Sequence, residues 1–183
     1  MKVSFYTLGC RLNQAETGLI ANSFRDKGYE IVEFGQPSDV CVINSCTVTE
    51  QADSDCRKLI RRVLRDHPDT YIALVGCYAQ VGSQQIQAIE GVDLIVGNQE
   101  KLQVAELIGQ PTKTGLTRIV VSPIAKGSFR IPASGTHLET TRANLKIQDG
   151  CDFMCSFCII PFARGRARSR DFADIRSEAL RLV

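Results

Sequence analysis

Several features are scarce in this chain, and each shortage excludes a class of protein. Its 183 residues contain no apolar run long enough to cross a membrane. The short apolar start is followed at once by Arg11, Asn13 and Glu16, which is not the pattern of a signal peptide. Proline is limited to 6 residues, and there is no internal repeat or low-complexity tract. We therefore expect a soluble globular protein, and 44% apolar residues are enough for a sizeable core.

Histidine is also scarce, which bears on metal chemistry. The only two histidines, His67 and His137, stand at no ligand spacing to the cysteine-rich motif near the end of the chain. A zinc site normally needs four Cys or His ligands, often as two closely spaced pairs. Zinc is therefore the less favoured interpretation of that motif.

Cysteine, by contrast, is abundant, with eight residues. The length of the chain, its helix-rich pattern and the lack of a signal favour reduced or metal-bound thiols in the cytoplasm over disulfides. Cys151, Cys155 and Cys158 form a C-x3-C-x2-C motif. Three thiolates can hold three irons of a cubane [4Fe-4S] cluster and leave the fourth iron open to a small chelating molecule. A simple ferredoxin would need a fourth cysteine, and none lies nearby.

From Lys2 to about Leu107, short apolar runs alternate with amphipathic stretches. This alternation predicts an α/β fold for residues 1–109, with an open, mostly parallel sheet and helices on both faces. The expected strands are Val3–Leu8, Glu30–Phe34, Val40–Asn44, Tyr71–Val75 and Leu94–Val96.

Two of the expected helices have signals at their ends. The first should begin with Asn13 as its N-terminal cap and close at Gly28. In the second, Thr47-Val-Thr-Glu50 predicts a capping box, and His67-Pro68 should stop the helix.

Three cysteines follow predicted strands directly. Cys10, Cys46 and Cys77 each come after such a strand and after a small residue, Gly or Ser. Because parallel strands end at one edge of a sheet, these thiols predict a second three-thiolate site, with three ordinary strand-end cysteines as the alternative. The remaining two, Cys41 within a strand and Cys56 on a helical apolar stripe, are expected to be small core residues.

Beyond residue 109 the composition changes. Residues 110–141 are rich in Pro, Gly, Ser and Thr, which predicts a linker with one or two extended pieces. Residues 142–183 then predict a strand over Ala143–Gln148, the cysteine loop and a helix over Ile175–Val183. A barrel of eight such units needs about 250 residues, so we expect only the first β/α unit of a truncated barrel.

Basic residues are concentrated in this last part. Residues 141–183 hold 8 Lys and Arg against 5 Asp and Glu. Within them Arg164, Arg166, Arg168 and Arg170 alternate with small residues, so on an extended segment all four would project from one face. Such a row is either a solvated face or a contact for RNA phosphate.

Four motifs resemble those of the radical S-adenosylmethionine methylthiotransferases, which modify transfer RNA or a ribosomal protein. The motifs are Thr7-Leu-Gly-Cys10-Arg-Leu-Asn13, Asn44-Ser-Cys46-Thr-Val-Thr49, Val75-Gly-Cys77-Tyr-Ala-Gln80 and Ile147-Gln-Asp-Gly-Cys151 through Cys158-Ile-Ile-Pro161-Phe-Ala-Arg-Gly165. The second and third motifs, with Arg164-Gly-Arg-Ala-Arg168, are most similar to enzymes acting on N6-threonylcarbamoyladenosine. They are less similar to relatives that act on isopentenyladenosine.

The resemblance implies two [4Fe-4S] clusters and S-adenosyl-L-methionine as cofactors. The cluster on Cys151, Cys155 and Cys158 would bind S-adenosylmethionine and give a 5′-deoxyadenosyl radical. The cluster held by the three strand-end cysteines would deliver a methylated sulfur to C2 of the adenosine at position 37 of a transfer RNA. Implied partners are the anticodon loop, contacted in part by the arginines from 164 to 170, and a reducing electron-transfer protein.

The resemblance also implies that more is needed for activity. Members of the family continue through the rest of the barrel and usually a small RNA-binding domain, so these 183 residues alone are expected to be inactive. Two alternatives stay open. One is a family member that acts on isopentenyladenosine or on a ribosomal protein, and the other is a non-catalytic metal-binding module.

Overall fold

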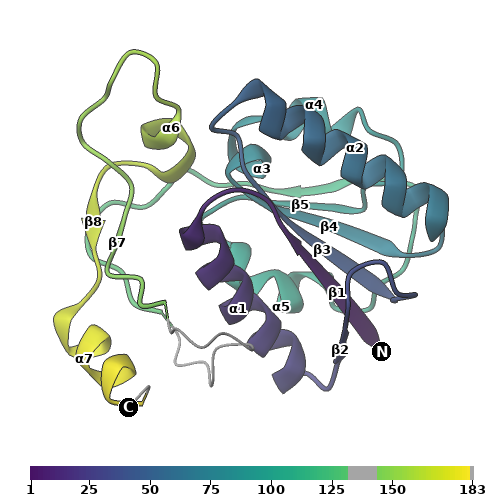
Figure 1. The fold of residues 1–183 in the computed structure, drawn as a ribbon, viewed down its shortest axis with the longest axis horizontal. Helices are drawn as coiled ribbons and strands as arrows, with labels where there is room; N and C mark the ends of the chain where they lie inside the picture. The colour runs from purple at the N-terminus through teal and green to yellow at the C-terminus, as the bar shows by residue number, and fades with distance from the viewer. Residues whose placement is uncertain (132–143, 182–183) are drawn as a thin grey trace.

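The computed structural model describes residues 1–131 and 144–181, and its largest element is a six-stranded parallel sheet (Figure 1). The strands lie side by side in the order β2-β1-β3-β4-β5-β6, and every neighbouring pair is parallel. Their bounds are β1 Lys2–Thr7, β2 Glu30–Val32, β3 Val40–Ser45, β4 Tyr71–Gly76, β5 Leu94–Val96 and β6 Arg118–Val120. The predicted α/β fold with an open parallel sheet is confirmed.

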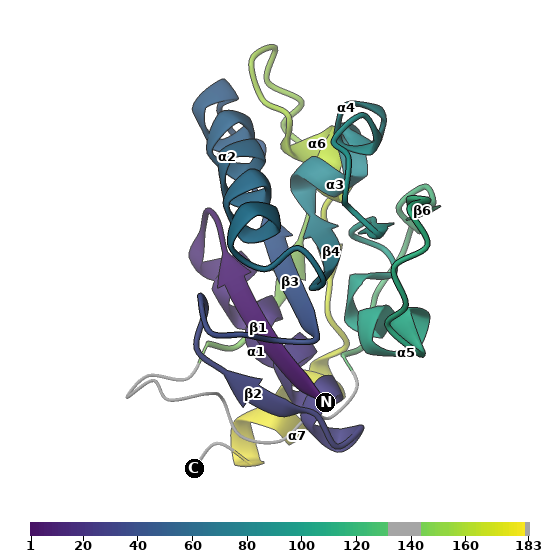
Figure 2. The same cartoon turned by 90° about the vertical axis from the view of Figure 1, so that its right-hand side faces the viewer.

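Helices cover both faces of the sheet (Figures 1 and 2). One face carries α1 (Arg11–Asp26), the short 3-10 helix η1 (Lys101–Gln103) and α5 (Val104–Ile108), and the other carries α2 (Glu50–Asp66), α3 (Cys77–Val81) and α4 (Ser83–Gln87). Successive side chains of a strand point to opposite faces. In β3, accordingly, Val40 and Val42 join the core beneath α1, whereas Cys41 and Ile43 join the core beneath α2.

Cys41 and Cys56 are core residues, as predicted. Their exposed fractions are 1% and 0%. Burial raises the pKa of the Cys41 thiol to about 11 and that of the Cys56 thiol to about 12. Both therefore stay protonated at neutral pH and act as small apolar side chains.

The first helix begins earlier than its sequence signal predicts. α1 starts at Arg11, after Cys10, and Asn13 is a buried residue inside its first turn. The Asn13 amide donates to the carbonyl oxygens of Leu8 and Ser45, at 2.8 and 3.0 Å, so it ties the ends of β1 and β3 together and cannot cap the helix. The other end is as predicted, because Gly28 has φ +79° and the N–H of Tyr29 donates to the carbonyl of Phe24.

The predicted capping box of α2 is wrong by two residues. The helix begins at Glu50, and the Thr49 hydroxyl accepts a hydrogen bond from the N–H of Ala52 at 3.1 Å. Thr47 is only 9% exposed, and its side chain is hydrogen-bonded to the Asp53 carboxyl group in the first turn of α2, so it is not the cap of this helix. The predicted stop is confirmed, because α2 ends at Asp66 and His67 follows as its C-cap.

The sheet continues into the segment predicted as a linker. β6 lies within residues 110–141 and pairs with β5, which extends the sheet past residue 109. Residues 132–141 of that segment lie outside the described part of the chain, as does His137. The division into segments 1–109, 110–141 and 142–183 stays a prediction.

The carboxyl-terminal segment differs from the expected start of a barrel. Its elements are β7 (Gln148–Asp149), α6 (Ile160–Arg164), β8 (Arg168–Ser169) and α7 (Phe172–Arg181). β7 and β8 pair antiparallel, whereas neighbouring strands of a β/α barrel are parallel. Within residues 144–181 the chain turns back after a short helix, so β8 reaches β7 from the opposite direction.

Three predictions for this segment need correction. The expected strand Ala143–Gln148 is limited to Gln148–Asp149, with Ala143 outside the described residues. The run from Arg164 to Arg170 is not one extended strand, because Arg164 ends a helix. The last helix begins at Phe172, before the predicted Ile175, and residues 182 and 183 lie outside the described part.

Among the residues that the structure describes, none of the helices combines the length and the apolar character needed to cross a membrane.

Candidate functional site

Three cysteines lie at the carboxyl ends of three neighbouring strands. Cys10 follows β1 and stands before α1, Cys46 follows β3, and Cys77 opens α3 directly after β4. Since β1, β3 and β4 are adjacent in the sheet, the topology brings these residues to one edge. Cys46 and Cys77 are each 6% exposed, whereas Cys10 is exposed. All eight cysteines of the chain are free thiols.

Two glycines leave the space that this arrangement requires. A Cβ on Gly9 would lie 2.6 Å from Cβ and 2.7 Å from Sγ of Cys46, and one on Gly76 would lie 2.5 Å from the side-chain oxygen of Asn44. Both residues have a positive φ, +96° and +101°, a conformation that favours glycine. The backbone therefore lies close to the Cys46 thiol at Gly9 and close to the end of β3 at Gly76.

The other three cysteines occupy one loop between β7 and α6. The loop is closed at its base, because the N–H of Cys151 donates to the carbonyl of Gly165 at 3.1 Å. A Cβ on Gly150 would lie 2.2 Å from the carbonyl oxygen of Arg166, so only glycine fits at the start of the loop. The N–H of Cys158 donates to the carbonyl of Cys155 at 3.0 Å, which closes a turn between the second and third cysteines.

The donor set fits an iron–sulfur cluster at each group. Across residues 1–131 and 144–181, no three His, Cys, Asp or Glu side chains are gathered closely enough to bind a single metal ion. A cubane places each thiolate on a different iron, so its ligands stand farther apart than the ligands of one ion. Three thiols and no histidine at either group are the ligands that iron–sulfur clusters use.

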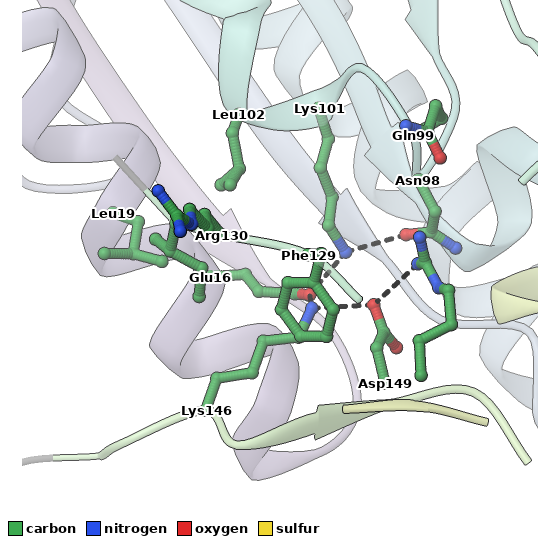
Figure 3. A pocket seen from close by; sticks show the side chains of 12 residues that line it. Glu16, Leu19, Asn98, Gln99, Lys101, Leu102, Phe129, Arg130, Lys146 and Asp149 are labelled. Atoms are coloured by element: carbon green, nitrogen blue, oxygen red, sulfur yellow. Dashed lines mark hydrogen bonds and ion pairs between the residues drawn. The ribbon is translucent and has the colours of Figure 1, made fainter. Parts of the chain in front are cut away.

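A buried ionic cluster joins the sheet to the segment that carries the cysteine loop, and Figure 3 shows Glu16, Lys101, Lys146 and Asp149 of this cluster. We use this name for six charged side chains that join α1, η1, the β7–β8 hairpin and α6. Its members are Glu16, Lys101, Lys146, Asp149, Arg164 and Arg168. Each of the six side chains is at most 11% exposed.

Glu16 is the centre of this cluster. Its carboxylate accepts two hydrogen bonds from Arg164, both at 3.1 Å, one from Lys101 at 2.5 Å and one from Lys146 at 2.7 Å. Asp149 is the second acceptor, with Lys146 at 2.7 Å and Arg164 at 3.1 Å. The contact between Arg164 and Glu16 is bidentate, and bidentate guanidinium contacts are among the strongest that a carboxylate makes.

The pKa values of the two carboxyl groups reflect these neighbours. Burial alone would raise the pKa of Glu16, but Lys101, Arg164 and Lys146 together hold it well below its usual range. The pKa of Asp149 is likewise lowered, because Lys146 and Arg164 outweigh burial. Burial lowers the pKa of Lys101 despite its contact with Glu16.

Beside the ionic cluster lies a pocket of about 110 Å³, shown in Figure 3. Phe129 covers it, with its ring centre 5.1 Å from Nζ of Lys146 and 5.5 Å from the guanidinium carbon of Arg168. The volume suits a few water molecules, since each occupies about 30 Å³ in the liquid, and is too small for a nucleotide.

The ionic cluster reaches the strand-end cysteines through two asparagines. Arg164 donates to the side-chain oxygen of Asn13 at 2.5 Å, and Asn13 in turn holds the carbonyl next to Cys46. Asn98 accepts from Lys101 at 2.7 Å, and its amide lies 3.6 Å from Sγ of Cys77. Asn98 also donates to the carbonyl of Ala163 at 2.6 Å, which joins α6 to the same edge.

The four arginines do not share one solvent-facing row. Arg164 and Arg170 are 5% and 4% exposed, and Arg170 is held by Asp174 at 2.6 Å and by Glu178. Arg168 is only partly accessible and lies 3.6 Å from Asp149. Arg166 is exposed. The predicted single face is wrong, because two of the four guanidinium groups are used inside the protein.

The ionic cluster was not predicted from the sequence, although one signal for it exists. The inward face of α1 carries Asn13, Glu16, Ile20 and Phe24 at helical spacing, and all four are buried. A glutamate within such a stripe needs a buried cation as partner. The partners could not be read from the sequence, because Lys101 and Arg164 are 85 and 148 residues away.

Comparison with known proteins places these observations in a family. Residues 2–97 match the family described as uncharacterized protein family UPF0004. The chain is 42% identical to the threonylcarbamoyladenosine tRNA methylthiotransferase MtaB of Bacillus subtilis, over 99% of this chain and 40% of the relative. It is 41% identical to the MtaB of Aquifex aeolicus, over 96% of this chain and 43% of that protein.

A third relative is named for a different base. The tRNA-2-methylthio-N(6)-dimethylallyladenosine synthase of Polynucleobacter asymbioticus is 32% identical, over the whole of this chain and 42% of its own length. The chain thus spans about 40% of the length of the curated relatives it matches. The family match covers more than half of the chain, and it includes all three strand-end cysteines. The chain therefore belongs to family UPF0004, the amino-terminal domain of the methylthiotransferases.

Proposed function

We propose that this chain is the amino-terminal part of a radical S-adenosylmethionine enzyme that adds a methylthio group to C2 of N6-threonylcarbamoyladenosine at position 37 of transfer RNA. The observation that carries the proposal is the gathering of Cys10, Cys46 and Cys77 at the ends of three adjacent strands, together with a separate loop of three cysteines. The similarity to two MtaB proteins at 41–42% identity supports the choice of base.

Each group of cysteines would hold one [4Fe-4S] cluster with an open iron. When bound, the cluster on Cys151, Cys155 and Cys158 would reduce S-adenosylmethionine to supply a radical, and the other cluster would carry the sulfur to be transferred. Two incomplete ligand sets on one chain support this division of labour, because an electron carrier would use four cysteines for each cluster.

The residues of this chain provide the frame for the two clusters. Gly9 gives the backbone its close approach to the Cys46 thiol, and Gly76 lets β4 pass close to Asn44 and Ser45 directly before Cys77. The hydrogen bond from Cys151 to Gly165 closes the cysteine loop, and Glu16 and Arg164 fasten the segment with that loop to α1. Buried Cys46 and Cys77 keep water from most of the strand-end site.

For contact with the anticodon loop, Arg166 is the remaining candidate among the four arginines, with Arg168 as a partly accessible neighbour. Phosphate contacts of this kind position an RNA without reading its sequence. A reducing electron-transfer protein is the second partner in the proposal, since radical formation needs an electron.

Anaerobic reconstitution of the whole chain with iron and sulfide tests the two cluster sites. We expect about eight irons per chain, because each cubane holds four. Replacing Cys10, Cys46 and Cys77 with alanine, or Cys151, Cys155 and Cys158, should leave about four irons in each case. The matched control is Cys56→Ala, which removes a buried thiol of the core and should keep both clusters. Zinc binding, or iron content that does not change in either triple variant, would contradict the proposal.

The substrate is tested in cells that lack the gene encoding this chain. Mass spectrometry of digested transfer RNA should show loss of the 2-methylthio form of N6-threonylcarbamoyladenosine. N6-threonylcarbamoyladenosine without the methylthio group should accumulate in its place. Loss of the methylthio group only from isopentenyladenosine, or only from a ribosomal protein, would assign the chain to another branch of the family.

A further inference from the structure

The buried ionic cluster carries more positive than negative charge. It contains four cations, Lys101, Lys146, Arg164 and Arg168, but only two carboxylates, Glu16 and Asp149. With all six groups ionised, their formal charge is +2. Keeping unpaired charge away from water costs several kcal/mol per ion, so an excess of this size calls for an anion close by.

The cysteines at the strand ends are where that anion would lie. Cys46 and Cys77 are buried next to the ionic cluster, and an iron–sulfur cluster held by three cysteine ligands would carry the negative charge. The Asn98 side chain bridges the two systems, since it contacts Lys101 at 2.7 Å and the sulfur of Cys77 at 3.6 Å.

Arg164 is the cation best placed to serve this site. Its second terminal nitrogen donates to Asn13 at 2.5 Å, and Asn13 holds the Ser45 carbonyl directly before Cys46. Burial opposes the charge on Arg164, but Glu16, the Cys77 sulfur and Asp149 raise its pKa above the ordinary value. The guanidinium is therefore a permanent charge, and Cys77 is among the groups that feel it.

We propose that Arg164 is a positioning residue of the Cys10–Cys46–Cys77 site, where its charge offsets that of the iron–sulfur cluster and raises the cluster's reduction potential. The inference rests on the proposed function, since it requires a cluster on these thiols. One-electron reduction makes such a cluster more negative by one charge, so a fixed cation nearby favours the reduced form.

The origin of Arg164 in the chain gives this charge a second role. Arg164 ends α6, which directly follows the loop of Cys151, Cys155 and Cys158. The segment with the radical-forming cysteines thus delivers the charge that sets the potential of the other cluster. Undocking this segment would remove the charge from the strand-end cluster and lower its reduction potential. Reduction of that cluster would thus depend on whether the segment is docked.

The test uses the whole chain with Cys151, Cys155 and Cys158 replaced by alanine, so that only the strand-end cluster is loaded. Potentiometric titration followed by electron paramagnetic resonance gives its reduction potential. In this background Arg164→Gln should lower the reduced-to-oxidised ratio about tenfold at a fixed solution potential, equal to a shift of about 59 mV for one electron. Arg164→Lys keeps the charge and should restore most of the potential.

Two further variants separate charge from structural damage. Asp149→Asn removes a negative charge from the buried ionic cluster that contains Arg164. It should raise the reduction potential of the iron–sulfur cluster, which loss of packing would not do. Arg166→Gln removes an exposed arginine two residues from Arg164 and should leave the potential unchanged. If Arg164→Gln fails to load iron, the opposite shift in Asp149→Asn decides the question alone.

The outcomes distinguish this inference from the proposed function. Iron-loaded variants that all have the same potential would overturn the role of Arg164 and leave the proposed function intact. A parent chain that binds no iron at Cys10, Cys46 and Cys77 would contradict the proposed function and this inference with it.

Discussion

Single glycines determine how close the backbone comes to the strand-end cysteines. At Gly9 the missing side chain leaves room for Cys46, and the positive φ of this residue holds Cys10 at the start of α1. The same combination of positive φ and close contact recurs at Gly76, before Cys77. Two of the three thiols in this site are thus preceded by a residue that no other amino acid can replace without strain.

Gly9→Ala should disrupt this site. The new Cβ would lie 2.6 Å from that of Cys46, and the backbone conformation would be strained, so we expect a loss of about 1–3 kcal/mol in stability and about half of the iron after reconstitution. Thermal unfolding and iron analysis provide the measurement. The control is Gly18→Ala within α1, where nothing lies within 4 Å and alanine should stabilise the helix by about 0.5–1 kcal/mol. Equal iron content in the two variants would refute the steric argument.

At the scale of single elements, local signals fix where a helix lies better than where it begins. α2 has its apolar stripe and its stop at His67 as predicted, but its cap is Thr49, because the Thr47 side chain is hydrogen-bonded to Asp53. α1 begins before Asn13 for a similar reason, since the amide of Asn13 is bound to the strand ends. In both cases the polar side chain that the sequence pattern assigns to the helix end is hydrogen-bonded to another group.

Thr49→Ala should therefore cost α2 its capping hydrogen bond to the N–H of Ala52 and lower the free energy of unfolding by about 1 kcal/mol. Chemical denaturation followed by circular dichroism measures the change. Thr49→Ser retains a hydroxyl at the same position and should stay close to the parent. A full loss in the serine variant would show that the methyl group, and not the cap, is what matters.

At the scale of the whole molecule, Glu16 joins parts of the chain that are far apart in sequence. It binds Lys101 of η1, Lys146 before β7 and Arg164 of α6, and so fastens the carboxyl-terminal segment to the helix that follows Cys10. The loop beyond this junction exposes Phe153 and Phe157, at 87% and 91%. Buried charge therefore contributes to the docking of that segment.

This dependence predicts a pH response. The pKa of Glu16 is lowered in the folded state, so its contribution to stability is present above the usual glutamate pKa of about 4.3 and is lost as the pH falls below it. Glu16→Gln should lose about 3–5 kcal/mol at pH 7, because it leaves buried cations unpaired, and should show a smaller further loss between pH 6 and pH 3 than the parent.

Denaturation curves at several pH values test this response. The control is Glu33→Gln, which replaces an exposed carboxylate and should keep the acid sensitivity of the parent. Parallel curves for the parent and Glu16→Gln over the whole range would show that Glu16 is not the group responsible.

Sequence patterns alone predicted five of the six strands, the helices that cover them and the grouping of the cysteines. These follow from local periodicity and from one rule of topology, that parallel strands end at a common edge, which brings Cys10, Cys46 and Cys77 together. The burial of Cys41 and Cys56 followed from the same patterns.

The attachment of the cysteine loop and the contacts of the arginines could be seen only in the folded molecule. Arg164 and Arg170 have the sequence context of a solvated basic row, but both are buried against carboxylates. The partners of Glu16 lie 85 to 148 residues away, and no local pattern records such a distance. A buried charge is placed by whichever opposite charge the fold brings to it, so its partner is known only once the fold is formed.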